Sequence, residues 1–422
     1  MKTNKPTRAS RSAGSLRERL RSHGTDIGIA LLLALAAACA VWILTGLQDH
    51  ILTLTNPKAD DVWFEGDAAR VFSNMTDRWG AHYRSNVHPV FSLFALAYGY
   101  VCAVLFRLDA LATVRVLLAS GAATWLAAFF ALLRLLGCRK PDSVLFCMVA
   151  ASSSAAIFWM AVPETYIFGS LTIIVVLVVS ALAERRPIPA WLDVATAAGA
   201  LSITVTNWMV ALASLATRHP IKRAIQLASN SFVVVVLLTG IQKFIVPSAV
   251  SLFDYKGEAK SFIAPELLTS LKVFFLHAMV MPDFQSVPQE PATLWPQLSI
   301  QHASTWHLTF WGPIALIAWL ILLGAGAWAV TTMKPLRRFR WTALIAVAGQ
   351  FALHLVYGSE SFLYSLDWLP ILVAIAALAS LTRLRPLVLC VASILVIAAL
   401  QQNYAELKLA FDTVAESAAL NP

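Results

Sequence analysis

Long apolar blocks alternate with short polar connections along most of the chain. The blocks run for about 17–25 residues, the length that an α-helix needs to cross a hydrocarbon core of about 30 Å. The pattern predicts an all-α polytopic membrane protein with about eleven transmembrane helices. We place these spans at 27–47, 110–134, 143–162, 166–183, 189–205, 207–217, 224–246, 307–330, 342–357, 368–381 and 386–401.

The composition strengthens the membrane assignment. Of the 422 residues, 59% are hydrophobic and only 13% are charged, whereas a soluble domain carries about 25% charged residues. The connections between the blocks are too short to hold a soluble domain with its own core. Four of the five cysteines lie in apolar blocks and none forms a C-x-x-C pair, so we interpret them as packing residues without a disulfide or a bound metal.

Three regions are expected along the chain. Residues 1–26 are polar and basic and predict a disordered cytoplasmic tail without a cleavable signal. Residues 27–401 form a single transmembrane catalytic domain, and 402–422 a short external tail. The basic tail is expected to contact anionic membrane lipids; nucleic acid is the weaker alternative and is not expected as a partner.

Most of the 32 Lys and Arg residues fall in the tail or in alternate loops. Because basic loops stay in the cytoplasm, their positions predict an N-terminus inside and an external C-terminus. We expect the membrane to be a bacterial inner (plasma) membrane. The clustered loop residues are Arg134, Arg139, Lys140, Arg185, Arg186, Arg218, Lys222, Arg223, Lys334, Arg337, Arg338, Arg340, Arg383 and Arg385.

The apolar segment 90–106 does not fit this alternation as a span. If it crossed the membrane, every later basic loop would move outside. We therefore expect it to lie along the membrane within an external loop of about 48–109. The stretch 267–281 is expected to do the same in the external loop 246–306. The alternative is that two short spans elsewhere are miscounted.

The first external loop is rich in charged side chains. After Gly66 the chain predicts a helix whose first turn holds Asp67, with Arg70 three residues on and on the same face. A carboxylate beside a guanidinium can accept a proton from a hydroxyl and hold a phosphate. An N-terminal helix cap with a local ion pair is the alternative. Further phosphate-binding candidates in the loop are Arg78, Arg84 and His88.

Later external turns add more candidates. Glu164 follows Pro163 at the end of a span, where a carboxylate close to the bilayer is costly. It is predicted to face Asp67, with capping of the next helix as the alternative. Substrate-binding candidates in these turns are Tyr166, Glu360 and Tyr364, although Glu360 and Tyr364 equally suit a polar loop.

The common sequence motifs of nucleotide-binding, metalloprotease and serine-hydrolase sites are absent from the sequence. There is no P-loop, G-x-G-x-x-G, H-E-x-x-H or G-x-S-x-G motif. A nucleotide-binding domain has no room, so any donor is expected to arrive through the membrane. We expect no cofactor; a divalent metal is possible but not required.

The layout resembles the GT-C glycosyltransferases, such as protein O-mannosyltransferases and lipid A aminoarabinose transferases. The resemblance rests on an acid in a large first external loop, the His88-Pro89 step into a membrane-hugging helix, and a second acid in the next external turn. It implies a polyprenyl-phosphate sugar donor and inverting transfer to a hydroxyl of an envelope glycan, lipid or protein. Matched by position, Asp67 is the general base and Glu164 the second catalytic acid.

Two other classes of protein stay open. A transporter or flippase of lipid-linked sugars would place ionisable residues along a path through the membrane. A non-catalytic assembly subunit would use the Asp67 and Glu164 carboxylates structurally.

Overall fold

The structure is a computed structural model that describes residues 8–47, 62–254, 262–287, 297–304 and 309–420, with side chains from Gly24 to Glu416 within these ranges. Helices dominate it, and the only strands in the described ranges form one short antiparallel pair. The elements are α1 (Arg8–Leu47), α3 (Ala68–Thr76), α4 (Phe91–Phe106), α5 (Ala110–Leu136), α6 (Lys140–Ala151), α7 (Ser154–Trp159), α8 (Tyr166–Ala183), α9 (Ala190–Ile203), α10 (Trp208–Arg218), α11 (Ile221–Ile245), α12 (Leu267–Lys272), β1 (Gln285–Val287), β2 (Gln297–Ser299), α13 (Trp311–Thr332), α14 (Arg337–His354), α15 (Ser365–Leu378) and α16 (Arg385–Leu420).

Seven helical segments in the described ranges are long and apolar enough to cross a membrane. This confirms an all-α membrane protein at the level of class. The segments are Gly24–Leu47, Ala110–Leu136, Tyr166–Ala183, Ile221–Ile245, Trp311–Thr332, Ser361–Leu381 and Arg385–Glu416. Shorter apolar helices cover Phe91–Phe106, Ala190–Ile203 and Leu267–His277.

The predicted span 143–162 is divided into α6 and α7 at Ser152 and Ser153. The freed backbone groups are bound by other segments: Ser154 N–H donates to Met279 O at 3.1 Å, and Asn403 Nδ2 donates to Ser152 O at 2.8 Å. Such compensation is required because lipid offers backbone groups no hydrogen bonds. The break therefore belongs to the packed interior and leaves few unsatisfied groups.

Both predicted tails differ from expectation. Helix α1 already begins at Arg8, within the tail predicted to be disordered, since Arg, Ala, Leu and Glu there are good helix formers. Helix α16 continues through the predicted tail 402–422 as far as Leu420. It does so because apolar side chains recur every three to four residues at Leu407, Ala410 and Val414, which are buried.

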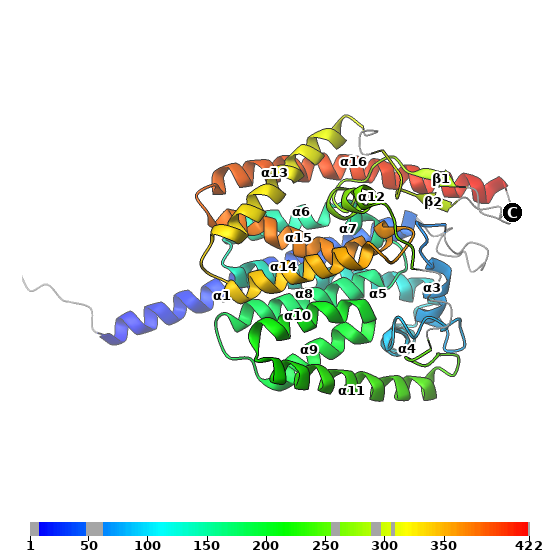
Figure 1. Cartoon of the computed structure of the whole chain (residues 1–422), viewed down its shortest axis with the longest axis horizontal. Coiled ribbons are helices and arrows are strands. Elements are labelled where there is room, and N and C mark those ends of the chain that lie inside the picture. The colour runs from blue at the N-terminus through cyan, green and yellow to red at the C-terminus, as the bar shows by residue number, and fades with distance from the viewer. Residues whose placement is uncertain (1–7, 48–61, 255–261, 288–296, 305–308, 421–422) are drawn as a thin grey trace, which may run out of the picture.

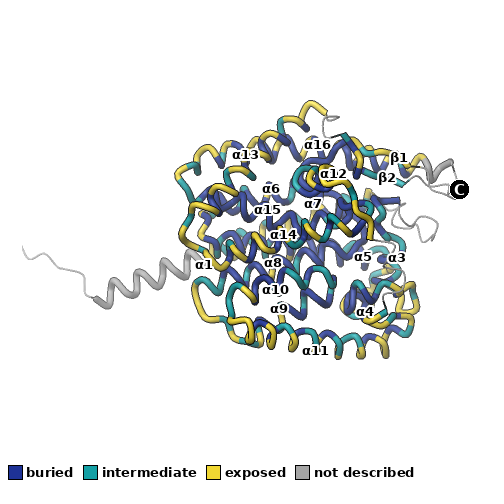
Figure 2. Tube along the Cα trace, in the orientation of Figure 1, coloured by how far each residue is buried: buried dark blue, intermediate teal, exposed yellow. Residues whose placement is uncertain are grey.

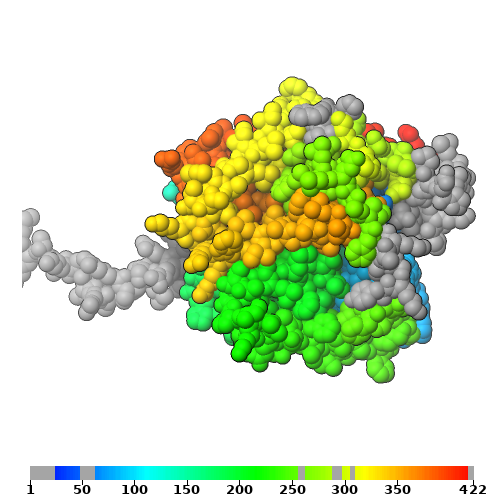
Figure 3. All heavy atoms as spheres, viewed as in Figure 1, coloured from blue at the N-terminus to red at the C-terminus, as the bar shows by residue number. Residues whose placement is uncertain are grey.

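The long helices run side by side, and α15 lies at the centre of the bundle (Figure 1). Every residue of α15 is buried, whereas α11 and α13 expose much of their surface, as the dark blue and yellow tubes of Figure 2 show. On the face seen in Figure 3, the green helices α10 and α11 lie next to the yellow and orange segments that include α14. Outer apolar side chains are those expected to face lipid.

The two ends of the bundle differ in charge. At one end Arg134 and Lys140 lie against Asp26, and Arg385 binds Asp142. These residues belong to the connections predicted to be cytoplasmic. At the opposite end α3, α4 and the β1–β2 pair gather, near the end of α16 (Figure 1). The candidate site lies at this second end.

Candidate active site

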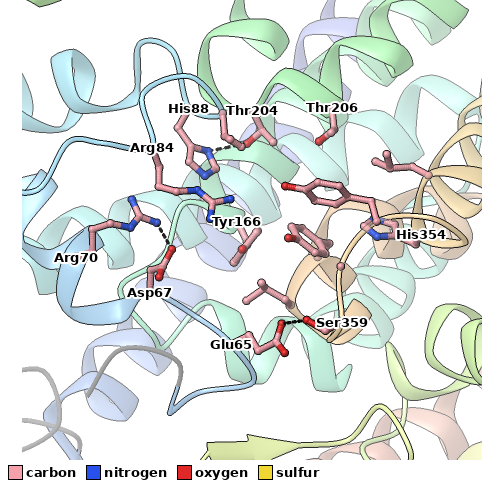
Figure 4. A pocket seen from close by; sticks show the side chains of 16 residues that line it. Glu65, Asp67, Arg70, Arg84, His88, Tyr166, Thr204, Thr206, His354 and Ser359 are labelled. Carbon is pink, nitrogen blue, oxygen red and sulfur yellow. Dashed lines mark hydrogen bonds and ion pairs between the residues drawn. The ribbon is translucent and has the colours of Figure 1, made fainter. Parts of the chain in front are cut away.

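A cavity of about 140 Å³ is built from segments far apart in sequence (Figure 4). A water needs about 10–15 Å³, so the cavity has room for a polar group several times larger. Charged and hydroxyl side chains dominate its wall. The lining residues are Glu65, Asp67, Arg70, Arg84, Val87, His88, Tyr166, Thr204, Thr206, Leu353, His354, Tyr357, Gly358, Ser359, Leu363 and Tyr364.

A strained turn carries the acidic side chains into the cavity. Phe64 and Glu65 have φ angles of 50° and 62°, in the left-handed region that bulky residues avoid. Each such residue costs about 1–3 kcal/mol and persists only where the surroundings hold it. Here Phe64 is fully buried, with its ring 4.9 Å from that of Phe158 and 5.3 Å from that of Phe362.

Gly66 completes this turn. Its N–H donates to Trp63 O at 2.7 Å, and an added Cβ would lie 2.8 Å from the same oxygen. No larger residue fits this position without a shift of the backbone. The turn therefore fixes where the chain enters α3.

Asp67 is the N-terminal cap residue of α3, the alternative to the predicted place in the first helical turn, and the helix begins one residue later at Ala68. Its carboxylate makes no capping hydrogen bond and instead binds Arg70, with Nη2 2.5 Å from Oδ2. The Arg70 side chain is 4% exposed and that of Asp67 is 21% exposed. The ion pair thus holds Asp67 at the edge of the cavity while one of its faces stays accessible.

Glu164 lies directly behind Asp67 and does not line the cavity. It is buried, its Oε2 accepts the Thr165 N–H at 3.1 Å, and its Oε1 has no hydrogen-bond partner among the described residues. Burial, together with the neighbouring Asp67 charge, raises the pKa of the Glu164 carboxyl to about 7. The two acids predicted to face each other are adjacent, and Glu164 contacts the chain rather than the open space.

Arg84 and His88 come from the segment between α3 and α4. This segment is fastened to the end of α9: Val205 N–H donates to Val87 O at 3.0 Å, and Val90 N–H donates to Ser202 O at 2.8 Å. Figure 4 shows the Arg84 guanidinium reaching between His88 and Tyr166. A cation thus enters the cavity on the same side as the carboxylate of Asp67.

His88 is held in its neutral form. Burial, with the Arg70 charge next, lowers the pKa of His88 to about 3. Its Nδ1 lies 2.9 Å from Ile203 O, so Nδ1 carries the proton and donates it to this carbonyl. A neutral imidazole of this tautomer offers a hydrogen-bond acceptor, which does not suit the phosphate-binding role expected from the sequence.

Aromatic side chains form the far wall. The Tyr166 and Tyr364 rings lie 5.7 Å apart edge to face, and Tyr364 stacks on His354 at 4.9 Å. Tyr357 adds a third ring 6.0 Å from Tyr364. Both predicted tyrosines therefore reach the cavity.

Two predicted residues lie elsewhere. Arg78 stacks on Trp79 at 4.8 Å and lines a separate apolar groove beside α4. Glu360 is buried, and its Oε2 accepts hydrogen bonds from Ser299 Oγ at 2.6 Å and from two backbone N–H groups of residues 300 and 301. These hydrogen bonds fasten the end of β2 and the residues after it, and Glu360 is not among the residues that line the cavity.

Several lining residues were not predicted from the sequence. Glu65 carried a signal, because it stands two residues before Asp67 in the same turn. Thr204, Thr206, His354 and Ser359 carried none, since they lie at the ends of helices predicted to be apolar spans or in a turn with other polar residues. Only the folded chain brings them to the cavity.

The charges of the cavity wall come in two pairs of opposite sign, from Glu65 and Asp67 and from Arg70 and Arg84. In the described residues no three His, Cys, Asp or Glu side chains converge as a metal site would need. Metal independence remains a prediction. The chain matches no protein-family model and no curated protein sequence.

Proposed function

We propose that this protein is a GT-C-type glycosyltransferase that moves a sugar from a polyprenyl-phosphate donor to an acceptor hydroxyl. The acceptor belongs to an envelope glycan, lipid or protein. The observation that carries the proposal is that an accessible carboxylate, Asp67, and a cation, Arg84, line the same polar cavity at one end of an apolar bundle. Such a site receives a charged headgroup whose tail stays in the membrane.

The proposed topology places the site on the extracytoplasmic face of a bacterial inner membrane. The basic connections meet at the opposite end of the bundle, where Arg185 Nη2 donates to Leu135 O and Glu184 accepts the Phe339 N–H. Basic loops stay cytoplasmic. The proposal retains eleven spans, an internal N-terminus, an external C-terminus, and helices near 91–106 and 267–277 along the membrane.

In the proposed reaction the acceptor hydroxyl attacks the anomeric carbon from the face opposite the phosphate. The Asp67 carboxylate takes the hydroxyl proton as the new C–O bond forms. The bond between the anomeric carbon and the phosphate oxygen breaks, and the polyprenyl phosphate leaves with the bonding electrons. Configuration at the anomeric carbon is inverted.

The leaving phosphate needs a nearby positive charge more than it needs a proton. Arg84 supplies this charge from within the cavity, and Arg70 keeps the Asp67 carboxylate in place. Glu164, buried behind Asp67, is a positioning residue in this proposal. Since the leaving group is a single phosphate on a lipid, the proposed reaction does not depend on a divalent metal.

The transporter alternative predicts charged groups along a path through the bundle. The cavity charges are instead concentrated at one end, which favours transfer. The two functions separate in detergent solution, where no membrane exists to be crossed. Transfer of sugar between two dissolved substrates in detergent supports the enzyme. If the protein is active in membranes but transfers no sugar in detergent, the result supports transport.

The decisive variant is Asp67→Asn. We expect transfer to fall by roughly 10²–10⁴-fold, the contribution of a general base, with unchanged membrane abundance. A strain that lacks the protein should accumulate a polyprenyl-phosphate sugar, detected by mass spectrometry of its lipids. Normal transfer by Asp67→Asn would show that this carboxylate is not the base.

A further inference from the structure

The cavity wall is divided by charge. Figure 4 shows Arg70, Arg84 and His88 on the side of Asp67, and Glu65 with Ser359 on another side, away from Arg84 and His88. The Ser359 hydroxyl donates to Glu65 Oε2. On the first side Asp67 offsets the charge of Arg70 and His88 is neutral, so Arg84 is the group that attracts a phosphate, whereas the Glu65 side repels one.

The Glu65–Ser359 contact joins two distant parts of the chain. Glu65 belongs to the left-handed turn before α3, and Ser359 follows Gly358, whose φ is 90°, in the turn between α14 and α15. Two unusual backbone conformations therefore meet at one hydrogen bond. Strain of this kind gathers at ligand sites, where it holds a side chain in a defined place.

A carboxylate beside a hydroxyl suits the hydroxyl groups of a sugar. Ser359 occupies one hydrogen-bonding position on Glu65, and an ionised carboxylate has about four. The rings of Tyr357 and Tyr364 line the same cavity and offer apolar faces and phenol groups. This combination of acceptors, hydroxyls and aromatic faces is matched to a polyol and unsuited to a phosphate.

We propose that Glu65, held by Ser359, binds hydroxyl groups of the transferred sugar and sets which sugar the protein accepts. The inference rests on the proposed function, because it takes the Arg84 side as the phosphate site. The donor then lies across the cavity with its phosphate at Arg84 and its sugar at Glu65. Asp67 lies on the Arg84 side of the cavity, where it would face the anomeric carbon of the bound donor.

Binding of short donors tests this arrangement. We would titrate the purified full chain in detergent with farnesyl phosphate, and with its esters of mannose, glucose, galactose, arabinose and N-acetylglucosamine, using calorimetry. We expect at least one ester to bind the wild type more tightly than farnesyl phosphate does. Glu65→Gln should weaken that ester by about tenfold or more and change farnesyl phosphate by less than about twofold, because only a hydrogen bond to the charged carboxylate is lost.

Glu360→Gln is the matched control. It makes the same chemical change at an acid that binds the protein chain outside the cavity. We expect it to leave the preference between ester and farnesyl phosphate unchanged, and Arg84→Gln to weaken both ligands. Thermal unfolding of each variant shows that the fold is retained.

Two results would overturn the inference. Equal weakening of ester and farnesyl phosphate by Glu65→Gln would make Glu65 a structural link only, and no weakening of either would remove it from the site. A wild type that binds neither farnesyl phosphate nor any ester contradicts the proposed function itself. That outcome is distinct, because it appears before any variant is compared.

Discussion

The two ends of the helix bundle hold their carboxylates in different ways. At the basic end the buried Asp193 lies 2.7 Å from Arg218 Nη2 and 2.9 Å from His219 Nε2. Asp142, also buried, lies 2.7 Å from Arg385 Nη2. Each acid there is balanced by a cation that belongs to a neighbouring connection.

At the cavity end two buried acids have no such direct partner among their hydrogen bonds. Glu164 accepts the backbone N–H of Thr165, and Glu360 is bound by the Ser299 hydroxyl and two backbone N–H groups. Burial accordingly raises the pKa of each of these carboxyls to about 7. Asp67, which lines the cavity, is by contrast paired with Arg70.

The difference lies in how each end accommodates a buried carboxyl group. An ion pair at the basic end neutralises itself and joins helices. At the cavity end, hydrogen bonds from the protein chain hold Glu164 and Glu360, and the carboxylate that lines the cavity is that of Asp67. The comparison leads us to expect losses of stability at one end and losses of activity at the other.

Asp193→Asn should produce the largest loss of stability. It leaves the Arg218 guanidinium, which is 3% exposed, without its carboxylate. Breaking a buried pair in this way costs about 3–5 kcal/mol of unfolding free energy. Thermal unfolding in detergent measures it, and the double variant Asp193→Asn/Arg218→Gln should recover part of the loss. A single variant as stable as the wild type would remove the structural role of this pair.

Arg84→Gln should act on the reaction instead. Loss of the cation beside the leaving phosphate is expected to lower transfer by roughly 10²–10³-fold, or about 2.7–4 kcal/mol. Initial rates with a labelled donor measure the effect. Arg84→Lys, which keeps the charge, should retain part of the activity. Equal rates for wild type and Arg84→Gln would place the phosphate elsewhere.

The raised pKa of Glu360 predicts a dependence of stability on pH. Between about pH 4.5 and 7 the folded chain keeps a proton that the unfolded chain releases, so the unfolding free energy falls as pH rises. The fall is on the order of 3 kcal/mol for this shift. Glu360→Gln should flatten the change in melting temperature between pH 5 and 8. An unchanged slope would contradict burial of an ionisable Glu360.

Arg78→Gln should have the smallest effect. Arg78 shares a loop with Arg84 but stacks on Trp79 outside the cavity. We expect transfer within about twofold of the wild type and a change in stability below about 0.5 kcal/mol. A loss as large as that of Arg84→Gln would extend the phosphate site to Arg78.

Local spacing explains which site residues the sequence could supply. Asp67 and Arg70 are three residues apart on one helix, so helical geometry alone brings them together. Arg84 and His88 lie within the same loop and were found for that reason. Thr204, His354 and Ser359 could not be found, because contacts across more than a hundred residues leave no local pattern.

The direction of a side chain was the second property that the sequence could not supply. Arg78 and Glu360 have the right chemistry in external loops, yet one points to an apolar groove and the other to the chain after β2. A charged residue type in a loop does not say which way its side chain points. The break in the predicted span 143–162 could not be predicted for a related reason. The hydrogen bond that satisfies the Ser152 carbonyl at the break comes from Asn403, which lies in another helix.

By itself the sequence determined the class of this protein and the asymmetry of its loops. The length of an apolar segment and the charge of a loop act through the free energy of transferring each residue from water to lipid. This free energy depends on residue type and can therefore be read from the sequence. Only the tertiary structure decided that Glu65 and Ser359 meet, that Glu164 lies behind Asp67, and that His88 stays neutral. These features arise from burial and from contacts between distant segments, which exist only once the helices have packed.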